Sequence, residues 1–273
     1  MRLPIAFEMQ VQPGSLTDLR LQQPARVDDI AKAADGFSWV FLGENHATAP
    51  HQQMEADIVS ALLKRHRRVV VGLEMITRPK QFVLDLWSSG QLAEADFLQQ
   101  VDWKGQWGYD YGFYRPLLET VRKNKLPLVA LNVPRDWVRA VGKGGFGGLS
   151  PEQKAELPAD MSLENAEHRS VFTALMGGHP MTGPSGENIY AAQVLWDEGM
   201  ADTALKWLGS HPHDKRTVFV VVAGSGHSMY GQGINYRVFR RTGERGITVE
   251  MAQAEAPTMV SRGVGDFLYL TSK

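Results

Sequence analysis

Apolar residues in this chain form short continuous runs, separated by longer segments in which apolar positions recur every three or four residues. The strongest runs are rich in valine, leucine and phenylalanine and are bounded by glycine, proline or charged residues. This pattern is typical of strands buried on both faces of a parallel sheet. The four strongest runs span residues 37–42, 69–75, 126–133 and 217–223, and two weaker candidates span 247–252 and 267–271.

Helical patterns lie between the predicted strands. Within residues 51–65, for example, Met54, Ile58 and Leu62 form one apolar stripe. Strands that alternate with helices indicate βαβ units and a right-handed connection between parallel strands. We therefore predict an α/β fold for residues 1–273, a single domain with a mostly parallel central sheet flanked by helices. A helical insertion over about residues 145–210 is expected to form a lid over one edge of the sheet.

Composition excludes several classes of protein. The chain has 273 residues, of which 29 are basic and 30 acidic, and no basic run indicates nucleic-acid binding. It has no cysteine, which excludes cysteine nucleophiles, disulfides and cysteine zinc sites. No apolar run is long enough to span a membrane.

Chemically reactive side chains follow each of the four strongest strand candidates. The first is followed by Glu44 and His46, the second contains Glu74 at its end, the third ends at Asn132, and the fourth is followed by His227. Ligands of open parallel sheets bind beyond the carboxyl ends of the strands, so these side chains should converge. A carboxylate such as Glu74 in an apolar strand is costly unless it is paired. Each residue alone is equally consistent with a structural role, but the set predicts a functional site.

The glycine-rich segment 224–231 does not match a nucleotide-binding fingerprint. A Gly-x-Gly-x-x-Gly pattern that begins at Gly224 requires glycine at position 229, which is Met229. We therefore expect these glycines to permit a tight turn after the strand, not to hold a phosphate.

Five segments occur in a characteristic order along residues 38–241. They are Gly43-Glu-Asn-His46, the strand end Leu73-Glu74, Tyr114-Arg-Pro116, Asn132-Val-Pro-Arg135 and Gly224-Ser-Gly-His-Ser-Met-Tyr-Gly-Gln-Gly233. This ordered set resembles the ChaN-type haem-binding uptake proteins, which share a superfamily with the Tiki metalloproteases and the erythromycin esterases. The pair of Gly-x-x-His motifs, at 43–46 and 224–227, is similar to the signature of that superfamily.

The resemblance implies a protein that binds ferric haem as a carrier or store in bacterial haem and iron uptake. It also implies a homodimer with haem at the interface and a partnership with an outer-membrane haem uptake system. The implied location is the periplasm, or the outer membrane as a lipoprotein, although a leader and a lipidated cysteine are not present in this chain.

Tyr230 is the residue that the resemblance favours as the ligand of the haem iron, because phenolate is a hard anionic donor that suits ferric iron. His227 could accept a hydrogen bond from this tyrosine or help to hold its charge. Met229 and the aromatic residues between 103 and 114 are candidates for the apolar walls of the haem site. Arg135 and Arg237 are candidates for pairing with the propionates.

The same residues also permit a hydrolase. His46 could act as a general base oriented by Glu44 or Glu74, or His46, Glu74 and His227 could hold a divalent metal with a position open to water. A binding module without a cofactor would explain the lid but not the clustered glutamate and histidine residues. Tyr230 distinguishes the interpretations, because a hydrolase has no evident use for it. We therefore favour a haem-binding protein over an enzyme.

Overall fold

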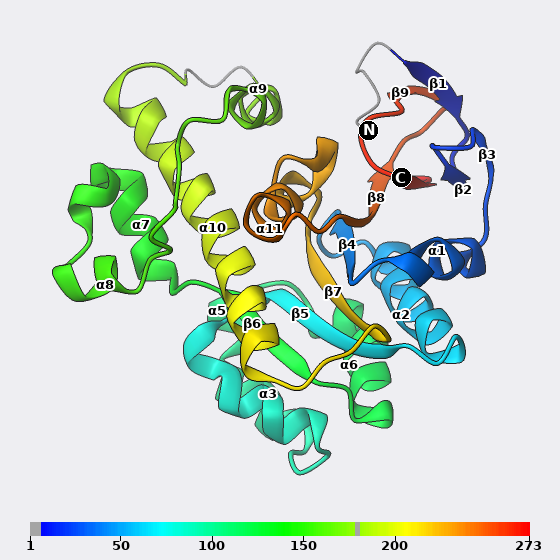
Figure 1. Ribbon diagram of the computed structural model, residues 1–273, viewed down its shortest axis with the longest axis horizontal. Coiled ribbons are helices and arrows are strands. Elements are labelled where there is room, and N and C mark those ends of the chain that lie inside the picture. Colours follow the sequence, from blue (N-terminus) through cyan, green and yellow to red (C-terminus); the bar gives the residue numbers. More distant parts are fainter. Residues whose placement is uncertain (1–6, 178–180) are drawn as a thin grey trace.

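A computed structural model describes residues 7–177 and 181–273 and confirms the α/β class, with a central sheet flanked by helices (Figure 1). The main sheet contains eight strands. They are β2 (Ser15–Asp18), β3 (Gln23–Pro24), β4 (Trp39–Glu44), β5 (Arg68–Thr77), β6 (Leu128–Asn132), β7 (Thr217–Gly224), β8 (Gly246–Gln253) and β10 (Phe267–Thr271).

The spatial order of these strands is β3-β2-β10-β8-β4-β7-β5-β6. The six strands from β10 to β6 run parallel, and β2 and β3 continue the sheet in antiparallel pairing. All six strand candidates of the sequence are therefore present. β4, β7 and β5 are direct neighbours, so the side chains that follow them emerge at one edge of the sheet, as expected.

Four short strands were not predicted. Besides β2 and β3, they are β1 (Glu8–Val11) and β9 (Thr258–Ser261), which form a separate two-stranded antiparallel sheet. Each has at most four residues, and β3 and β9 bury no side chain. Strands this short and exposed carry too few apolar positions to produce a recognisable pattern.

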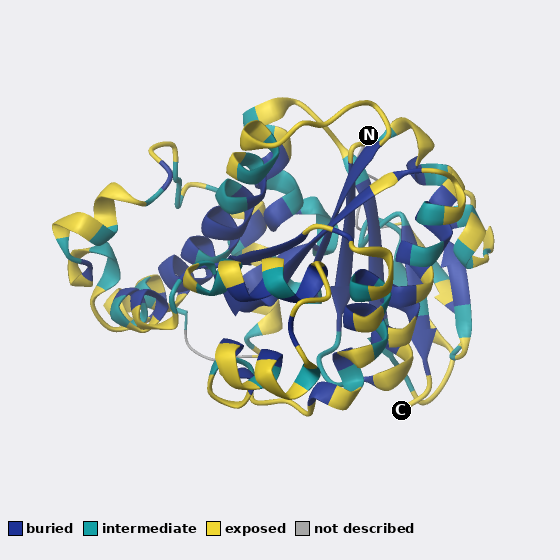
Figure 2. Cartoon of the chain, turned by 90° about the horizontal axis from the view of Figure 1, so that it is seen from below, coloured by how far each residue is buried: buried dark blue, intermediate teal, exposed yellow. Residues whose placement is uncertain are grey.

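Helices cover both faces of the parallel sheet. One face packs against α1 (Val27–Ala33), α2 (Ala49–Lys64), α3 (Gln81–Ser88) and α6 (Tyr111–Asn124), and the other packs against α10 (Gly183–Ser210) and α11 (Ile234–Thr242). Figure 2 shows the strands as a buried layer between these helices. Because each strand is buried on both faces, its sequence is apolar throughout and does not alternate.

The remaining helices are shorter. They are α4 (Glu94–Val101), α5 (Trp103–Gln106), α7 (Arg135–Gly144), α8 (Pro151–Ala155) and α9 (Ala166–Leu175), with the 3₁₀ turns η1 (Ala34–Gly36), η2 (Arg78–Lys80), η3 (Gly145–Gly148), η4 (Ser225–His227) and η5 (Met229–Gly231). None of the helices in residues 7–177 and 181–273 has the length and apolar character needed to cross a membrane.

The predicted insertion at 145–210 is divided between two roles. η3, α8 and α9 lie outside the sheet layers, on the side of α7 and α10 (Figure 1). In contrast, Met200, Ala201 and Ala204 in the second half of α10 pack into the apolar core on the sheet. This half of α10 is therefore part of a helix layer on the sheet and directly precedes the parallel strand β7.

An irregularity near the end of β5 positions Glu74. The pairing of β5 with β6 shifts register between Leu73 and Thr77, which is the mark of a bulge. The Asn132 side chain donates a hydrogen bond of 3.0 Å to the Glu74 carbonyl. The bulge and this hydrogen bond hold Glu74 at the carboxyl edge of the sheet.

Candidate functional site

A pocket of about 430 Å³ lies at the carboxyl edge of the parallel strands. It contains residues that follow β4 and β7, as the sequence predicts, together with side chains from the insertion. Its lining comprises Glu44, Asn45, His46, Tyr109, Phe172, Leu175, Gln193, Gly224, Ser225, Gly226 and His227. We call it the edge pocket.

His46 and Glu44 form a hydrogen-bonded dyad in the edge pocket. His46 Nδ1 lies 2.7 Å from Glu44 Oε1, and the His46 side chain is 28% exposed while that of Glu44 is completely buried. Glu44 also accepts hydrogen bonds from Gln52 and from the Tyr114 hydroxyl, the latter at 3.2 Å. Burial lowers the pKa of His46, but the hydrogen bond that it donates to Glu44 and the charge of Glu74 outweigh burial and raise the pKa. The dyad therefore leaves His46 Nε2 as the nitrogen free to act in the pocket.

His227 is buried between two carboxylates. Its Nδ1 lies 2.5 Å from Asp197 Oδ1, and its Nε2 lies 3.3 Å from Glu74 Oε1. Burial alone would lower the pKa of His227, but the charges of Glu74 and Asp197 raise it to about 10. His227 is therefore a cation at neutral pH. Glu74 is further held by the Gly224 amide, which donates to it over 2.7 Å.

Close approach of the two Gly-x-x-His segments requires glycine at position 224. A Cβ atom on Gly224 would lie 2.9 Å from His46 Cε1 and 3.0 Å from His46 Nε2, closer than real Cβ contacts. The glycine therefore admits the His46 ring beside the end of β7, in agreement with the expectation of a tight strand-to-turn passage.

A metal site at His46, Glu74 and His227 is not supported by their arrangement. Both nitrogens of His227 already face carboxylates, and His46 Nδ1 faces Glu44. In the described part of the chain, no group of three or more His, Asp or Glu side chains is placed to hold a metal ion. The hydrolase interpretation is considered below on the His46–Glu44 dyad, which the structure places in the edge pocket.

Three residues that the sequence analysis did not assign to the site form a buried network with His227. They are Asp197, Gln193 and His168. Asp197 of α10 is completely buried and accepts His227 on one oxygen, while its other oxygen lies 3.0 Å from His168 Nε2 and 3.3 Å from Arg237. Gln193, one turn earlier in α10, lies 3.1 Å from His227 Nδ1. The i, i+4 spacing of polar Gln193 and Asp197 within an otherwise apolar stretch was the signal that could have revealed this role.

Tyr230 lies outside the edge pocket. It occupies η5 in the left-handed conformation, with φ of 59° and ψ of 12°, and its amide donates to the Val264 carbonyl over 2.8 Å. Tyr230 and His227 line different pockets. The expected pairing of Tyr230 with His227 is therefore replaced by the pairing of His227 with Asp197 and Glu74. A left-handed conformation is uncommon for a residue other than glycine, and such strain concentrates at functional sites.

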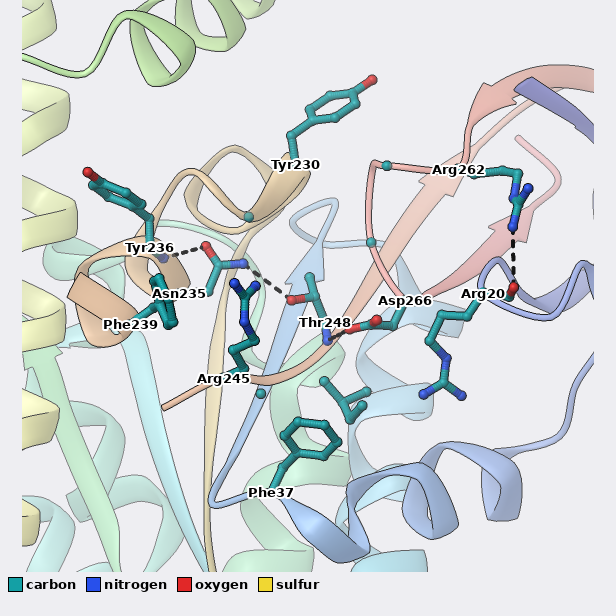
Figure 3. Close-up of a pocket in the computed structure, with 15 residues that line it drawn as sticks. Arg20, Phe37, Tyr230, Asn235, Tyr236, Phe239, Arg245, Thr248, Arg262 and Asp266 are labelled. Atoms are coloured by element: carbon teal, nitrogen blue, oxygen red, sulfur yellow. Dashed lines mark hydrogen bonds between the residues drawn. The ribbon is translucent and has the colours of Figure 1, made fainter. Parts of the chain in front are cut away.

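Tyr230 instead borders a second pocket of about 420 Å³, which we call the tyrosine pocket (Figure 3). Tyr230 projects outward above the other labelled side chains in this view. Arginines, aromatic side chains and glycines share the wall. The lining residues are Arg20, Phe37, Tyr230, Gly231, Asn235, Tyr236, Phe239, Arg245, Gly246, Ile247, Thr248, Arg262, Gly263, Gly265 and Asp266.

The other residues predicted for the haem site lie elsewhere, and Arg237 requires a correction. The Arg237 side chain is 1% exposed and lies between Asp197 and Glu198, because it shares the buried face of α11 with Ile234 and Val238. Arg135 donates to the Gly105 carbonyl and does not line the tyrosine pocket. Neither arginine is available to a ligand beside Tyr230.

The predicted apolar walls are also placed differently. Met229 is half-buried and does not line the tyrosine pocket. Of the aromatic residues between 103 and 114, Trp103, Tyr111 and Tyr114 are buried in the main core. Tyr109 lines the edge pocket.

A family model described as haem-binding uptake, Tiki superfamily, ChaN matches residues 30–238 of this chain. The matched region contains the His46–Glu44 dyad, Glu74, His227 and Tyr230. The order of motifs from 43 to 233 thus lies within the match.

Solved structures share the fold. ChaN of Campylobacter jejuni, described as binding haem cofacially, has a TM-score of 0.71 at 18% identity, with 93% of this chain and 95% of that chain covered. An erythromycin esterase mutant in its open conformation has a TM-score of 0.52 at 14% identity, with 89% and 77% covered. Among curated proteins, the chloroplastic protein RETICULATA-RELATED 5 of Arabidopsis thaliana is 24% identical over 253 residues, covering 85% of this chain. The chain spans 34% of the length of that relative.

Proposed function

This chain belongs to the haem-binding uptake family of the Tiki superfamily, and from that premise we propose that it binds ferric haem in the tyrosine pocket with the Tyr230 phenolate as iron ligand. The observation that carries this proposal is the position of Tyr230 at the rim of a pocket walled by arginines and aromatic rings (Figure 3). Haem presents a flat apolar ring, an iron atom and two carboxylates. The aromatic side chains can pack against the ring, Tyr230 can bind the iron, and arginines can pair with the carboxylates.

The chemistry of Tyr230 suits a carrier more than an electron-transfer protein. Burial raises the pKa of Tyr230, and the charge of Glu250 raises it further, so the free side chain is a neutral phenol. Coordination must displace its proton, and the resulting phenolate favours ferric over ferrous iron. A ligand held in this way is weakened when the iron is reduced or when a nitrogen donor competes for it.

We also propose a homodimer in which haem lies at the interface, and a role as carrier or store in an outer-membrane haem uptake system. ChaN of Campylobacter jejuni, which shares the fold and is described as binding haem cofacially, supports the proposal of haem at a dimer interface. A periplasmic location, or attachment to the outer membrane as a lipoprotein, is consistent with this role.

Replacement of Tyr230 by phenylalanine is expected to abolish tyrosinate coordination. Titration of the wild type with ferric haem should give a saturable Soret shift with the bands of a tyrosinate complex. Tyr230→Phe should lose these bands and bind at least about tenfold more weakly, since even changes around metal ligands cost this much.

The matched control is Tyr236→Phe, which changes a tyrosine in the wall of the same pocket. This variant should retain the tyrosinate spectrum. An unaltered spectrum in Tyr230→Phe would exclude Tyr230 as the iron ligand.

A second candidate function is ester hydrolysis in the edge pocket, and the His46–Glu44 dyad is the observation that favours it. Glu44 orients His46 through Nδ1 at 2.7 Å, as required of a general base. His227 lines the same pocket, but both of its ring nitrogens face carboxylates, so the proposed chemistry rests on the dyad.

In this reaction, His46 Nε2 would take a proton from water as the water oxygen bonds to the ester carbonyl carbon. The carbon–alkoxide bond would then break, and protonated His46 would return its proton to the leaving alkoxide, giving an acid and an alcohol. Glu44 would keep the imidazole in one orientation throughout, with Gln52 and Tyr114 fixing the carboxylate.

The hydrolase candidate predicts turnover of p-nitrophenyl acetate above the buffer rate. His46→Ala should lower this rate about 10²- to 10⁴-fold, the contribution typical of a positioned general base. His211→Ala, which changes an exposed histidine at the end of α10, is the control and should keep the full rate. Absence of turnover in the wild type, or equal rates in both variants, would count against hydrolysis here.

A further inference from the structure

The tyrosine pocket has three arginines in its wall, and two of them are already engaged. Arg20 forms an ion pair with Asp18 at 2.7 Å. Arg262 donates to the carbonyl oxygens of Leu19 and Arg20 at 3.0 and 3.2 Å. Arg262 thereby links the loop after β9 to the segment after β2, and both guanidinium groups already use donors within the fold.

Arg245 is different from the other two arginines. Its guanidinium lies 4.4 Å from the centre of the Phe239 ring, and within residues 7–177 and 181–273 it has neither an ion pair nor a hydrogen-bond acceptor. The side chain is exposed. Stacking on an aromatic ring orients a guanidinium while leaving its in-plane donors free.

The acidic residues closest to Arg245 in the chain or in the pocket are committed to other partners. Glu244 accepts a hydrogen bond of 2.7 Å from Trp39 Nε1. Asp266 accepts from the Thr248 amide at 2.8 Å. The turn that carries Arg245 begins at Gly243, which ends α11 in the left-handed conformation. The fold thus fixes the turn through Glu244, and Arg245 forms no ion pair with either of these carboxylates in the described residues.

The surface around Arg245 is suited to a flat ligand. Gly231, Gly246, Gly263 and Gly265 contribute wall positions without side chains, while Phe37, Phe239 and Ile247 contribute apolar area. Figure 3 shows the Arg245 side chain beside Phe239 and below Tyr230 in this view. A ligand here would meet an apolar surface, a phenol at the rim and one free cation.

We propose that Arg245 binds a carboxylate of the ligand held in the tyrosine pocket and, resting on the proposed haem site, that this carboxylate is a haem propionate. A guanidinium can donate two parallel hydrogen bonds to one carboxylate, which gives orientation as well as affinity. Arg245 takes the role that the sequence suggested for Arg135 and Arg237.

The test compares ferric haem with its dimethyl ester, in which both propionates are esterified and uncharged. Affinities are measured by Soret titration for the wild type, Arg245→Gln and Arg245→Lys. Arg245→Gln should weaken haem binding roughly tenfold to a hundredfold, the range for a hydrogen bond between charged groups. It should leave dimethyl-ester binding unchanged and keep the tyrosinate bands with both porphyrins. Arg245→Lys should recover part of the loss, because lysine keeps the charge without the planar pair of donors.

Arg139→Gln, an exposed arginine on α7 outside the tyrosine pocket, is the matched control and should bind both porphyrins as the wild type does. Equal weakening of haem and its ester in Arg245→Gln, or no weakening of either, would overturn the role of Arg245. In that case the wild type would still give tyrosinate bands that depend on Tyr230. Failure of the haem proposal itself is distinct, because the wild type would then give no such bands with either porphyrin.

Discussion

Replacement of Asp197 by asparagine is expected to lower the free energy of unfolding by about 3–5 kcal/mol, the usual cost of breaking a buried charge pair. Asp197 is completely buried and is the shared anionic partner of His227, His168 and Arg237. Asparagine keeps the size of the side chain but carries no charge. The variant would therefore leave Glu74 as the remaining carboxylate beside His227 and Glu198 as the remaining carboxylate beside Arg237.

The control for Asp197→Asn is Glu187→Gln, which removes a carboxylate from the same helix. Glu187 pairs with Arg169 at 2.9 Å, but the Glu187 side chain is 54% exposed and that of Arg169 is 34% exposed. Exposed pairs of this kind contribute about 0–1 kcal/mol. Urea denaturation of both variants measures the loss in free energy of unfolding for each. A loss below about 1 kcal/mol in Asp197→Asn would show that this network does not hold the site together.

The pH dependence of stability provides an independent measure of the same network. The pKa of His227 is about 10 in the folded protein against an ordinary value of 6.5, so the folded state keeps a proton that the unfolded chain releases. The stabilisation is complete below pH 6.5 and is lost as the pH rises towards 10, at up to about 1.4 kcal/mol per pH unit. In Asp197→Asn this decline should end at a lower pH and be smaller in total, because Glu74 alone remains to raise the pKa of His227.

Replacement of Gly233 by alanine is expected to destabilise the protein by about 3 kcal/mol or more and to abolish the tyrosinate spectrum. A Cβ atom at Gly233 would overlap the carbonyl oxygen and carbon of His227, which are backbone atoms and cannot rotate away. The η4–η5 segment would have to move as a whole. This segment carries both His227 and Tyr230, so both pockets should lose their geometry together.

The comparison for Gly233→Ala is Gly209→Ala near the end of α10, where an added Cβ would meet no atom within 4 Å. Alanine is the better helix former, so the free energy of unfolding should stay constant or rise by up to about 1 kcal/mol. Thermal unfolding and Soret titration of the two variants separate local overlap at Gly233 from a general effect of losing a glycine. Normal stability and haem binding in Gly233→Ala would contradict the packing described for the turn.

The sequence predicted that reactive side chains meet at the carboxyl edge of the sheet, but it did not predict the contact of Asp197 with His227. Runs of apolar residues located the parallel strands, and residues after parallel strands must emerge at one edge of the sheet. Glu44, His46 and His227 were therefore predictable as neighbours. Asp197 was not assigned, because it comes from a helix in the insertion whose packing against η4 is set by contacts distant in the chain.

Sequence patterns could not predict which residues line the tyrosine pocket. Its arginines come from positions 20, 245 and 262, which are brought together by the pairing of β2 and β10 and of β10 and β8. Arg237 was one of two candidates for the propionates, yet its helical face is internal. Its spacing to the apolar Ile234 and Val238 on α11 could have indicated this burial.

By itself, the sequence determined the α/β class, the parallel strands, the edge at which reactive side chains meet and the presence of an uncommon His-x-x-Tyr segment. The tertiary structure decided that His227 and Tyr230 serve different pockets. The physical reason is that periodic apolar residues encode burial locally, whereas the direction of a side chain after a strand depends on the turn. Here a left-handed residue at Tyr230 and carboxylates from β5 and α10 set those directions.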